Sequence, residues 1–275
     1  MPSQILSQTE GRQYTAAKST VVISYVLSVI GVFYYFALGH FGKSYFTPFT
    51  ASQIIIVLYC IVTLLLQLLF IVQSFFNTNV SSSNQANILA VVGPHFSINN
   101  ILNFFWCYFF IRRNFLVAEI ILLVNLINLL SLYFTHKTVS IKSASDWLVV
   151  HFPTCGLPLS WTLYAIFWNG ACLFHSHYES LLPRLIANVL IWEFLVTPLA
   201  LLILYKDWSV SLSTSFLMLG LGLKQFFNKA IALQWIFAFV ISGIDFLASI
   251  LCIVRSSLAN RNTQTNSDEE APLLS

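Results

Sequence analysis

Charged side chains are scarce in this chain: Asp, Glu, Lys and Arg make up only 8% of its 275 residues. In a soluble domain about a quarter of the residues are charged, so this chain cannot cover a folded surface with charge. Its net charge of +3 is small and scattered, and no basic stripe indicates a nucleic-acid partner. With 57% apolar residues, the composition predicts an integral membrane protein whose main partner is the lipid bilayer.

Motifs that carry catalysis or metal binding are also missing. The chain contains no G-x-S-x-G, no H-E-x-x-H, no phosphate-binding Walker loop and no G-x-G-x-x-G. Its five cysteines form no C-x-x-C pair and lie within or at the edge of apolar segments, as buried thiols do. We therefore expect no enzymatic activity, no cofactor, no metal site and no disulfide framework.

Apolar segments recur along the chain and predict an all-α fold, a polytopic bundle of about eight transmembrane helices. Each segment is long enough to cross a hydrocarbon core of ~30 Å at about 1.5 Å per residue. The third segment is rich in Asn and the seventh in Ser, so both are weak and seven helices are the alternative. The bundle occupies residues 20–254, between a cytosolic N-terminal segment, 1–19, and a disordered tail, 255–275. Its predicted spans are 20–39, 53–76, 92–111, 115–134, 155–174, 183–205, 209–227 and 231–254.

The C-terminal tail carries a sorting pattern. Glu269 is followed, after three residues, by Leu273 and Leu274, which matches the acidic dileucine signal that clathrin adaptors bind. Because such a signal works only in the cytosol, we expect a vacuolar or other endomembrane address and, with an even number of spans, both termini in the cytosol. Lys and Arg are divided almost equally between the two sides and do not decide the orientation. In this orientation the glycosylation sequon at Asn79 lies in the cytosol and stays unmodified.

Two acids, Glu193 and Asp245, lie deep inside predicted spans. A charged residue at the centre of the bilayer costs roughly 2.5–3.5 kcal/mol or more and indicates a functional site by default. Pro198 follows Glu193 by five residues and predicts a kink, a combination typical of transporter binding sites. The two acids share one polar pocket if their spans are neighbours; otherwise each is a buried, protonated acid bonded to a neighbouring helix. We interpret Glu119, which lies near a membrane surface, as structural.

Amide and tryptophan side chains recur at helical spacing and predict a polar interior for the bundle. Asn99, Asn103 and Trp106 share one face of the third span, at positions i, i+4 and i+7. Further Trp and Asn side chains lie in the fifth and sixth spans. Besides the two deep acids, the predicted pocket residues are Asn103, Trp168, Asn169, Asn188 and Trp192. The alternative is that such amides only hydrogen-bond neighbouring helices, at ~0.6 kcal/mol each.

Several runs along the chain resemble an uncharacterised fungal family of multispanning membrane proteins, catalogued as a domain of unknown function. They are residues 47–53, 167–170, 187–189, 225–227, 234–239 and 271–274, together with Trp192. The resemblance implies a multispan architecture and a fungal endomembrane setting, and the family offers no activity. The Trp and Asn residues are also similar to those of the tryptophan-rich sensory (translocator) proteins, small helical bundles that bind porphyrins and sterols. No diagnostic motif of that second family is present.

These features favour a vacuolar transporter that moves a small solute through a polar pocket in the middle of the membrane. The alternative is a non-transporting bundle that binds a small-molecule ligand or serves as a scaffold, with its acids as buried structural groups. An intramembrane enzyme would need a nucleophile with its base, or a set of metal ligands, and the sequence offers neither.

Overall fold

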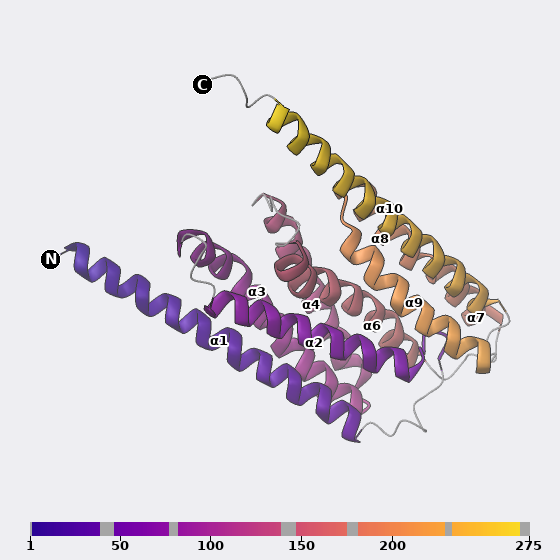
Figure 1. Ribbon diagram of the computed structural model, residues 1–275. Coiled ribbons are helices and arrows are strands. Elements are labelled where there is room, and N and C mark those ends of the chain that lie inside the picture. The colour runs from indigo at the N-terminus through magenta and orange to yellow at the C-terminus, as the bar shows by residue number, and fades with distance from the viewer. Residues whose placement is uncertain are drawn as a thin grey trace.

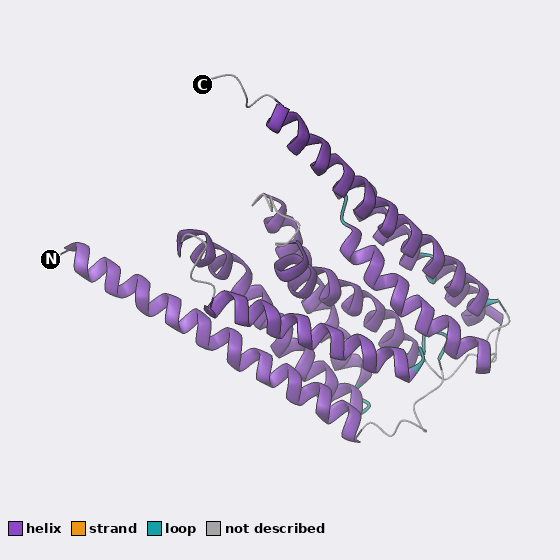
Figure 2. Cartoon of the chain, viewed as in Figure 1, coloured by secondary structure: helices purple, strands orange, loops and turns teal. Residues whose placement is uncertain are grey.

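The computed structural model describes residues 2–38, 47–76, 82–138, 147–174, 181–228 and 233–269. Within these ranges every regular element is a helix and none is a strand (Figure 2). The elements are α1 (Pro2–Leu38), α2 (Gln53–Phe76), α3 (Ser82–Ile111), α4 (Phe115–Thr138), the π-helix η1 (Trp147–Gly156), α6 (Leu157–Leu173), α7 (Leu181–Leu190), α8 (Glu193–Tyr205), α9 (Trp208–Asn228) and α10 (Gln234–Glu269). The fold is all-α, as the apolar segments predict.

The chain passes back and forth along one bundle (Figure 1). The π-helix η1 runs directly into α6, and only two residues separate α7 from α8, so the ten described elements form eight rods. Consecutive rods run in opposite directions, and α1 begins at the same end of the bundle at which α10 ends. This arrangement is the polytopic bundle of about eight helices that the sequence predicts.

Among the described residues, six helical stretches are long and apolar enough to cross a membrane. They are Thr15–Leu38, Gln53–Gln73, Phe115–Thr135, Leu185–Tyr205, Trp208–Phe227 and Gln234–Leu258. The other two rods pack inside the bundle, α3 along α1 and α4, and α6 along α4 and α9. α3 has 30 residues but carries several Asn and Ser side chains, and α6 has only 17 residues. Two predicted spans have weak sequence signals. The one in α9 is long and apolar enough to cross a membrane, and the one in α3 is not.

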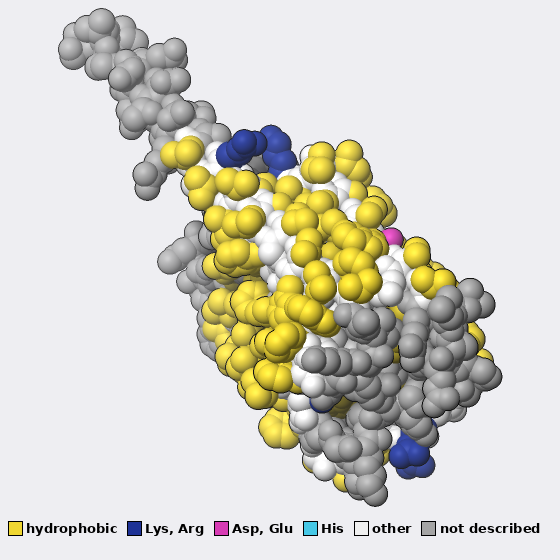
Figure 3. All heavy atoms as spheres, turned by 90° about the vertical axis from the view of Figure 1, so that its right-hand side faces the viewer, with side chains coloured by type: hydrophobic (Ala, Val, Ile, Leu, Met, Phe, Trp, Pro, Cys, Tyr) yellow, Lys and Arg dark blue, Asp and Glu magenta, His cyan; other side chains and the backbone are white. Residues whose placement is uncertain are grey.

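Apolar side chains cover the outside of the bundle. Figure 3 shows them across most of the described part of one face, with Lys and Arg towards its two ends. Ile54, Ile203 and Leu204 are each 72% exposed, and a soluble monomer rarely exposes such extensive apolar surface. Lipid covers this surface, so the chain is a multi-pass membrane protein.

α9 is the central helix of the bundle. In its apolar stretch 61% of the residues are buried, against 22–28% in the other five stretches. Gly220 lies against Ile55 of α2, and Gly222 lies against Phe239 of α10, because small residues let membrane helices approach closely. A helix that faces protein needs little lipid-like hydrophobicity, which explains the weak sequence signal of this span. Its buried hydroxyl side chains are Ser209, Ser211, Ser213, Thr214 and Ser215.

The first and last helices are longer than the sequence predicts. α1 begins at Pro2, and α10 continues to Glu269 instead of ending at residue 254. Both helices therefore extend into the segments expected to flank the bundle. Once a span is formed, each further residue adds a backbone hydrogen bond without a new nucleation step, so the helix propagates. The predicted features at Asn79, Leu273 and Leu274 lie outside the described residues.

Candidate functional site

A polar cavity lies between α1, α2, α3 and α6. It has two compartments, which share Val32, Cys60, Asn103 and Trp161. The centre of a water molecule can move through about 40 Å³ in one compartment and about 20 Å³ in the other. A single water needs about 10–15 Å³ by this measure, so the cavity has room for a few waters or one very small solute.

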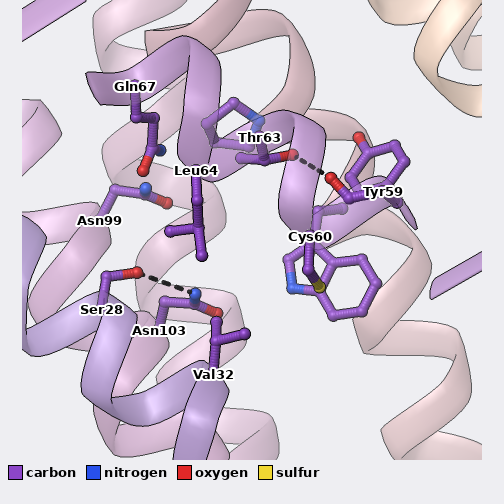
Figure 4. A pocket seen from close by; sticks show the side chains of 11 residues that line it. Ser28, Val32, Tyr59, Cys60, Thr63, Leu64, Gln67, Asn99 and Asn103 are labelled. Carbon is purple, nitrogen blue, oxygen red and sulfur yellow. Dashed lines mark hydrogen bonds between the residues drawn. The ribbon is translucent and has the colours of Figure 1, made fainter. Parts of the chain in front are cut away.

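Helical spacing brings the lining side chains to the cavity. Cys60, Leu64 and Gln67 follow one another at positions i, i+4 and i+7 on α2, and Asn99 and Asn103 are one turn apart on α3. Figure 4 shows the amides of Gln67 and Asn99 at one end of this compartment and Asn103 at the other. The polar face that the sequence predicts for α3 thus points into the cavity.

Hydrogen bonds link the amides in and behind the cavity wall. Asn103 Nδ2 donates to Ser28 Oγ of α1 at 3.4 Å (Figure 4). Behind the wall, Asn125 Nδ2 of α4 donates to Asn99 Oδ1 at 3.0 Å and to Thr162 Oγ1 of α6 at 3.2 Å. Across the described lining of both compartments there is no Asp, Glu, Lys or Arg. The cavity is therefore polar but uncharged.

Two lining side chains carry polar atoms that have no hydrogen-bond partner among the described residues. These atoms are Oε1 of Gln67 and Nε1 of Trp106, and both residues are only 2% exposed. The Nε2 atom of Gln67 makes one long bond, of 3.5 Å, to the main-chain oxygen of Pro153. A buried polar group without a partner costs roughly 1–3 kcal/mol, so the cavity favours an occupant that can both donate and accept hydrogen bonds.

Aromatic rings line and flank the cavity on the side that faces the bundle end opposite the start of α1. The ring of Trp168 is 4.9 Å from Phe110, 6.3 Å from Trp106 and 6.4 Å from Tyr35, centroid to centroid. These rings come from α1, α3 and α6 and form one aromatic layer. Trp168, a predicted pocket residue, belongs to this layer and does not line the cavity itself.

Asn169, the next predicted pocket residue, joins α6 to α4. Its Nδ2 donates to Glu119 Oε2 at 2.6 Å and to the main-chain oxygen of Phe115 at 2.8 Å. Glu119 thus has a hydrogen-bond partner on a neighbouring helix, the structural arrangement that its shallow position in the sequence suggests.

The structure does not bring Glu193 and Asp245 together. Glu193 opens α8 on the exposed surface of the bundle, where Thr197 Oγ1 donates to its carboxylate. Asp245 is fully buried on α10 and accepts a hydrogen bond from Ser211 Oγ of α9 at 3.2 Å. α8 buries its neighbouring Phe194 instead, and neither acid lines the described cavity.

The sixth rod breaks directly before α8 and not at its proline. A two-residue turn that ends at Trp192 separates α7 from α8, whereas Pro198 lies inside α8. Trp192 is 37% exposed, and its ring is 5.3 Å from that of Phe237 on α10. Asn188 is half-buried one turn before it. These two predicted pocket residues therefore belong to the outer part of the bundle.

A buried pair that the sequence patterns did not single out lies near the bundle end where α1 begins. His151 Nε2 of η1 is 2.9 Å from Asp207 Oδ2, in the turn between α8 and α9, and the residues are 2% and 0% exposed. Asp207 also caps α9, because its Oδ1 accepts bonds from the Ser209 N–H at 2.9 Å and from Ser209 Oγ at 2.5 Å. Burial raises the pKa of Asp207, but the bonds from His151 and Ser209 outweigh burial and hold that pKa below its usual range. In the sequence, Asp207 and Ser209 directly before a long segment are typical of a helix N-cap. That pattern could have marked Asp207 as the cap of α9.

The thiols and acids do not gather into a metal site. Throughout the described ranges, no three His, Cys, Asp or Glu side chains lie close enough together to hold an ion. The five cysteines are free thiols. Cys60 and Cys107 line the cavity, where they add polarisable sulfur atoms.

Comparison with known proteins finds relatives for one third of the chain. Residues 184–274 match the family described as "Fungal protein of unknown function (DUF1774)". The expected likeness to an uncharacterised fungal family is confirmed there. In Schizosaccharomyces pombe, "Uncharacterized protein C637.03" is 37% identical over 91 residues, which are 33% of this chain and 33% of that protein. No solved structure matches the chain.

The matched region and the cavity occupy different parts of the bundle. The match includes α8, α9 and α10, with Glu193, Asp207 and Asp245. The helices that line the cavity precede residue 184, as do the runs 47–53 and 167–170 on which part of the expected resemblance rests. The likeness to DUF1774 therefore covers α8, α9 and α10 and not the helices that line the cavity.

Proposed function

We propose that this chain is an endomembrane transporter that carries a small, uncharged polar solute through the cavity between α1, α2, α3 and α6. The observation that carries the proposal is the lining, which combines amide, hydroxyl, thiol and aromatic side chains without a charged group. A buried charge without a partner would be costly in such a site, so the lining favours a neutral solute over an ion. In this proposal the chain performs no chemical step.

The size of the cavity restricts the solute. The space suits a molecule of a few heavy atoms, since a drug-sized ligand needs roughly 300–1,000 Å³. Gln67 Oε1 and Trp106 Nε1 supply one acceptor and one donor without protein partners. A small polyol or amide carries both kinds of group, so it can bond either of these atoms in its own compartment.

The small volume also favours the alternative, a non-transporting bundle. If the cavity only holds waters, these waters would satisfy Gln67 and Trp106, and the polar groups would serve helix packing or a scaffold role. The two functions differ in one measurable property, because only a transporter increases the permeability of a membrane to the solute.

Solute flux through reconstituted vesicles tests the proposal. We expect the full chain to accelerate the swelling of vesicles in glycerol or urea, measured by stopped-flow light scattering. Asn103→Leu should reduce that flux about tenfold, because it removes a hydrogen bond worth roughly 1.4 kcal/mol at similar volume. Asn128→Leu is the matched control: Asn128 bonds His95 away from the cavity and its loss should leave flux intact. Equal swelling with and without the protein would favour the non-transporting bundle.

The proposed address is the vacuole or another endomembrane, with a clathrin adaptor as partner of the tail. Glu269, Leu273 and Leu274 supply the acidic dileucine pattern. α1 begins at the bundle end where α10 ends (Figure 1), which supports the proposal that both termini lie on one side of the membrane, in the cytosol. Replacing both leucines with Ala should send a tagged protein to the cell surface, whereas Ser275→Ala should not. Unchanged location, or a glycan on Asn79, would contradict this address.

A further inference from the structure

Asp245 is an acid buried between helices, and one of its two carboxyl oxygens has no described hydrogen-bond partner. It lies on α10 with no exposed surface. Ser211 Oγ of α9 is 3.2 Å from its Oδ1 and 3.4 Å from its main-chain oxygen, and Ser249 Oγ donates to that same main-chain oxygen at 2.7 Å. Its Oδ2 is buried and has no hydrogen-bond partner among the residues that the structure describes.

Cations do not face this carboxyl from α9 or α8, the helices against which α10 packs most closely. Lys224 of α9 is 13 positions beyond Ser211, about 20 Å along the helix. Arg255 is exposed, ten positions further along α10, about 15 Å away. Both therefore lie several helical turns from Asp245.

The other charged groups to consider lie in the corner between α8 and α9 and on α8 itself. Lys206 is exposed there. Asp207 and His151 are buried, but they are bonded to each other at 2.9 Å. On α8, Glu193 is exposed at the far end, and the ring of Tyr205 meets that of Tyr133 of α4 edge to face. None of these groups has a described bond to Asp245, whose side chain is bonded to a serine hydroxyl.

We propose that Asp245 is a proton-binding site, separate from the solute cavity, which holds a proton while α9 and α10 are packed. A carboxylate at this depth that pairs with no described cation would be strongly unfavourable. A hard metal ion is a poor alternative occupant, because it requires about six or more oxygen ligands. When water enters between the helices, the carboxyl releases the proton to it, leaving a solvated carboxylate and a hydronium ion.

The interface around Asp245 suits such an exchange. The α9–α10 contact uses small hydroxyl side chains, with Ser242 Oγ donating to the main-chain oxygen of Ser215 at 2.8 Å and Ser249 Oγ lying 3.4 Å from that of Trp208. Small residues let the two helices approach closely, so water reaches the carboxyl only when α9 and α10 move apart. Binding and release of the proton are thus coupled to the distance between α9 and α10.

Infrared spectroscopy of the full chain in lipid vesicles tests the site directly. At neutral pH we expect a carbonyl stretching band of a protonated carboxyl that is lost in Asp245→Asn. Ser211→Ala should shift the frequency of that band, because it removes the hydrogen bond to Oδ1. Glu119→Gln, which alters a half-buried carboxyl on α4, is the control and should leave the assigned band in place. Identical carboxyl bands in the wild type and Asp245→Asn would overturn the proposal.

The pH dependence of thermal unfolding provides a second readout that does not depend on transport. The wild-type unfolding temperature should fall as the pH rises above about 4, the pKa of an unfolded aspartate, because the folded chain keeps the proton of Asp245 that the unfolded chain loses. Asp245→Asn stays neutral and should lose this dependence, whereas a parallel fall in both proteins would contradict the site. A protein that keeps the infrared band but shows no solute flux would retain the proton site and refute the transporter.

Discussion

Replacement of His151 by Phe isolates the polar contribution of the buried pair at the α8–α9 corner. The ring of His151 lies 4.5 Å from that of Trp147 and 5.8 Å from that of Tyr133. Phe keeps an aromatic ring among these neighbours, so little packing is lost. What disappears is the bond between Nε2 and Asp207 Oδ2, of 2.9 Å. Any large loss of stability therefore reports on the carboxylate that is left behind.

The magnitude follows from what remains around Asp207. Its carboxylate accepts a hydrogen bond from His151 and two from Ser209, and it also interacts with the side chain of Tyr133. Removing one partner of a buried pair costs roughly 3–5 kcal/mol, and the two bonds that remain favour the lower end. We expect His151→Phe to lower the free energy of unfolding by about 3 kcal/mol. Asp207→Asn should cost only about 1 kcal/mol, because Asn caps a helix as well as Asp and leaves no buried charge.

Denaturant unfolding of the purified protein in detergent micelles measures both changes. His95→Phe is the matched control, because His95 Nδ1 is 2.9 Å from the neutral amide oxygen of Asn128. Its loss should cost about 1 kcal/mol, the usual value for a neutral hydrogen bond. A cost for His151→Phe no larger than that of His95→Phe would refute the reasoning, since it would mean that the charge of Asp207 is already satisfied without the histidine.

Other outcomes follow from single contacts. The pKa of Asp207 is lower when folded than its unfolded value of about 3.9, so its contribution is present above about pH 4 and lost as the pH falls through the folded pKa; Asp207→Asn should remove that acid dependence of thermal unfolding. Gly220→Ala places a Cβ 2.7 Å from Ile55 and should lower the unfolding free energy by about 1–3 kcal/mol. Gly243→Ala meets no described atom within 4 Å and should be neutral or stabilising by up to about 1 kcal/mol in the same assay. Asn125→Leu breaks two buried bonds and should cost about 1–3 kcal/mol.

Local composition was enough to predict the class of this protein. An apolar stretch about 20 residues long predicts a membrane helix whatever its neighbours are, and α2, α4 and α10 follow that rule. Spacing also predicted one face of a helix, since Asn99 and Asn103 are one turn apart wherever α3 packs. Composition underestimated the span in α9. Its hydropathy is low because this helix faces protein on most sides, whereas a hydropathy scale assumes that lipid surrounds the helix.

Contacts between helices depended on the tertiary structure. Glu193 and Asp245 had similar sequence signals, yet one is exposed on α8 and the other buried on α10, because the sequence of a span does not determine which side of it meets a neighbour. His151 and Asp207 lie 56 positions apart, and no local pattern joins them. The number and type of helices were thus set by the sequence of each segment, whereas the polar pairs were decided by packing, which rotates each helix about its axis until small and polar residues meet inside and apolar ones face the lipid.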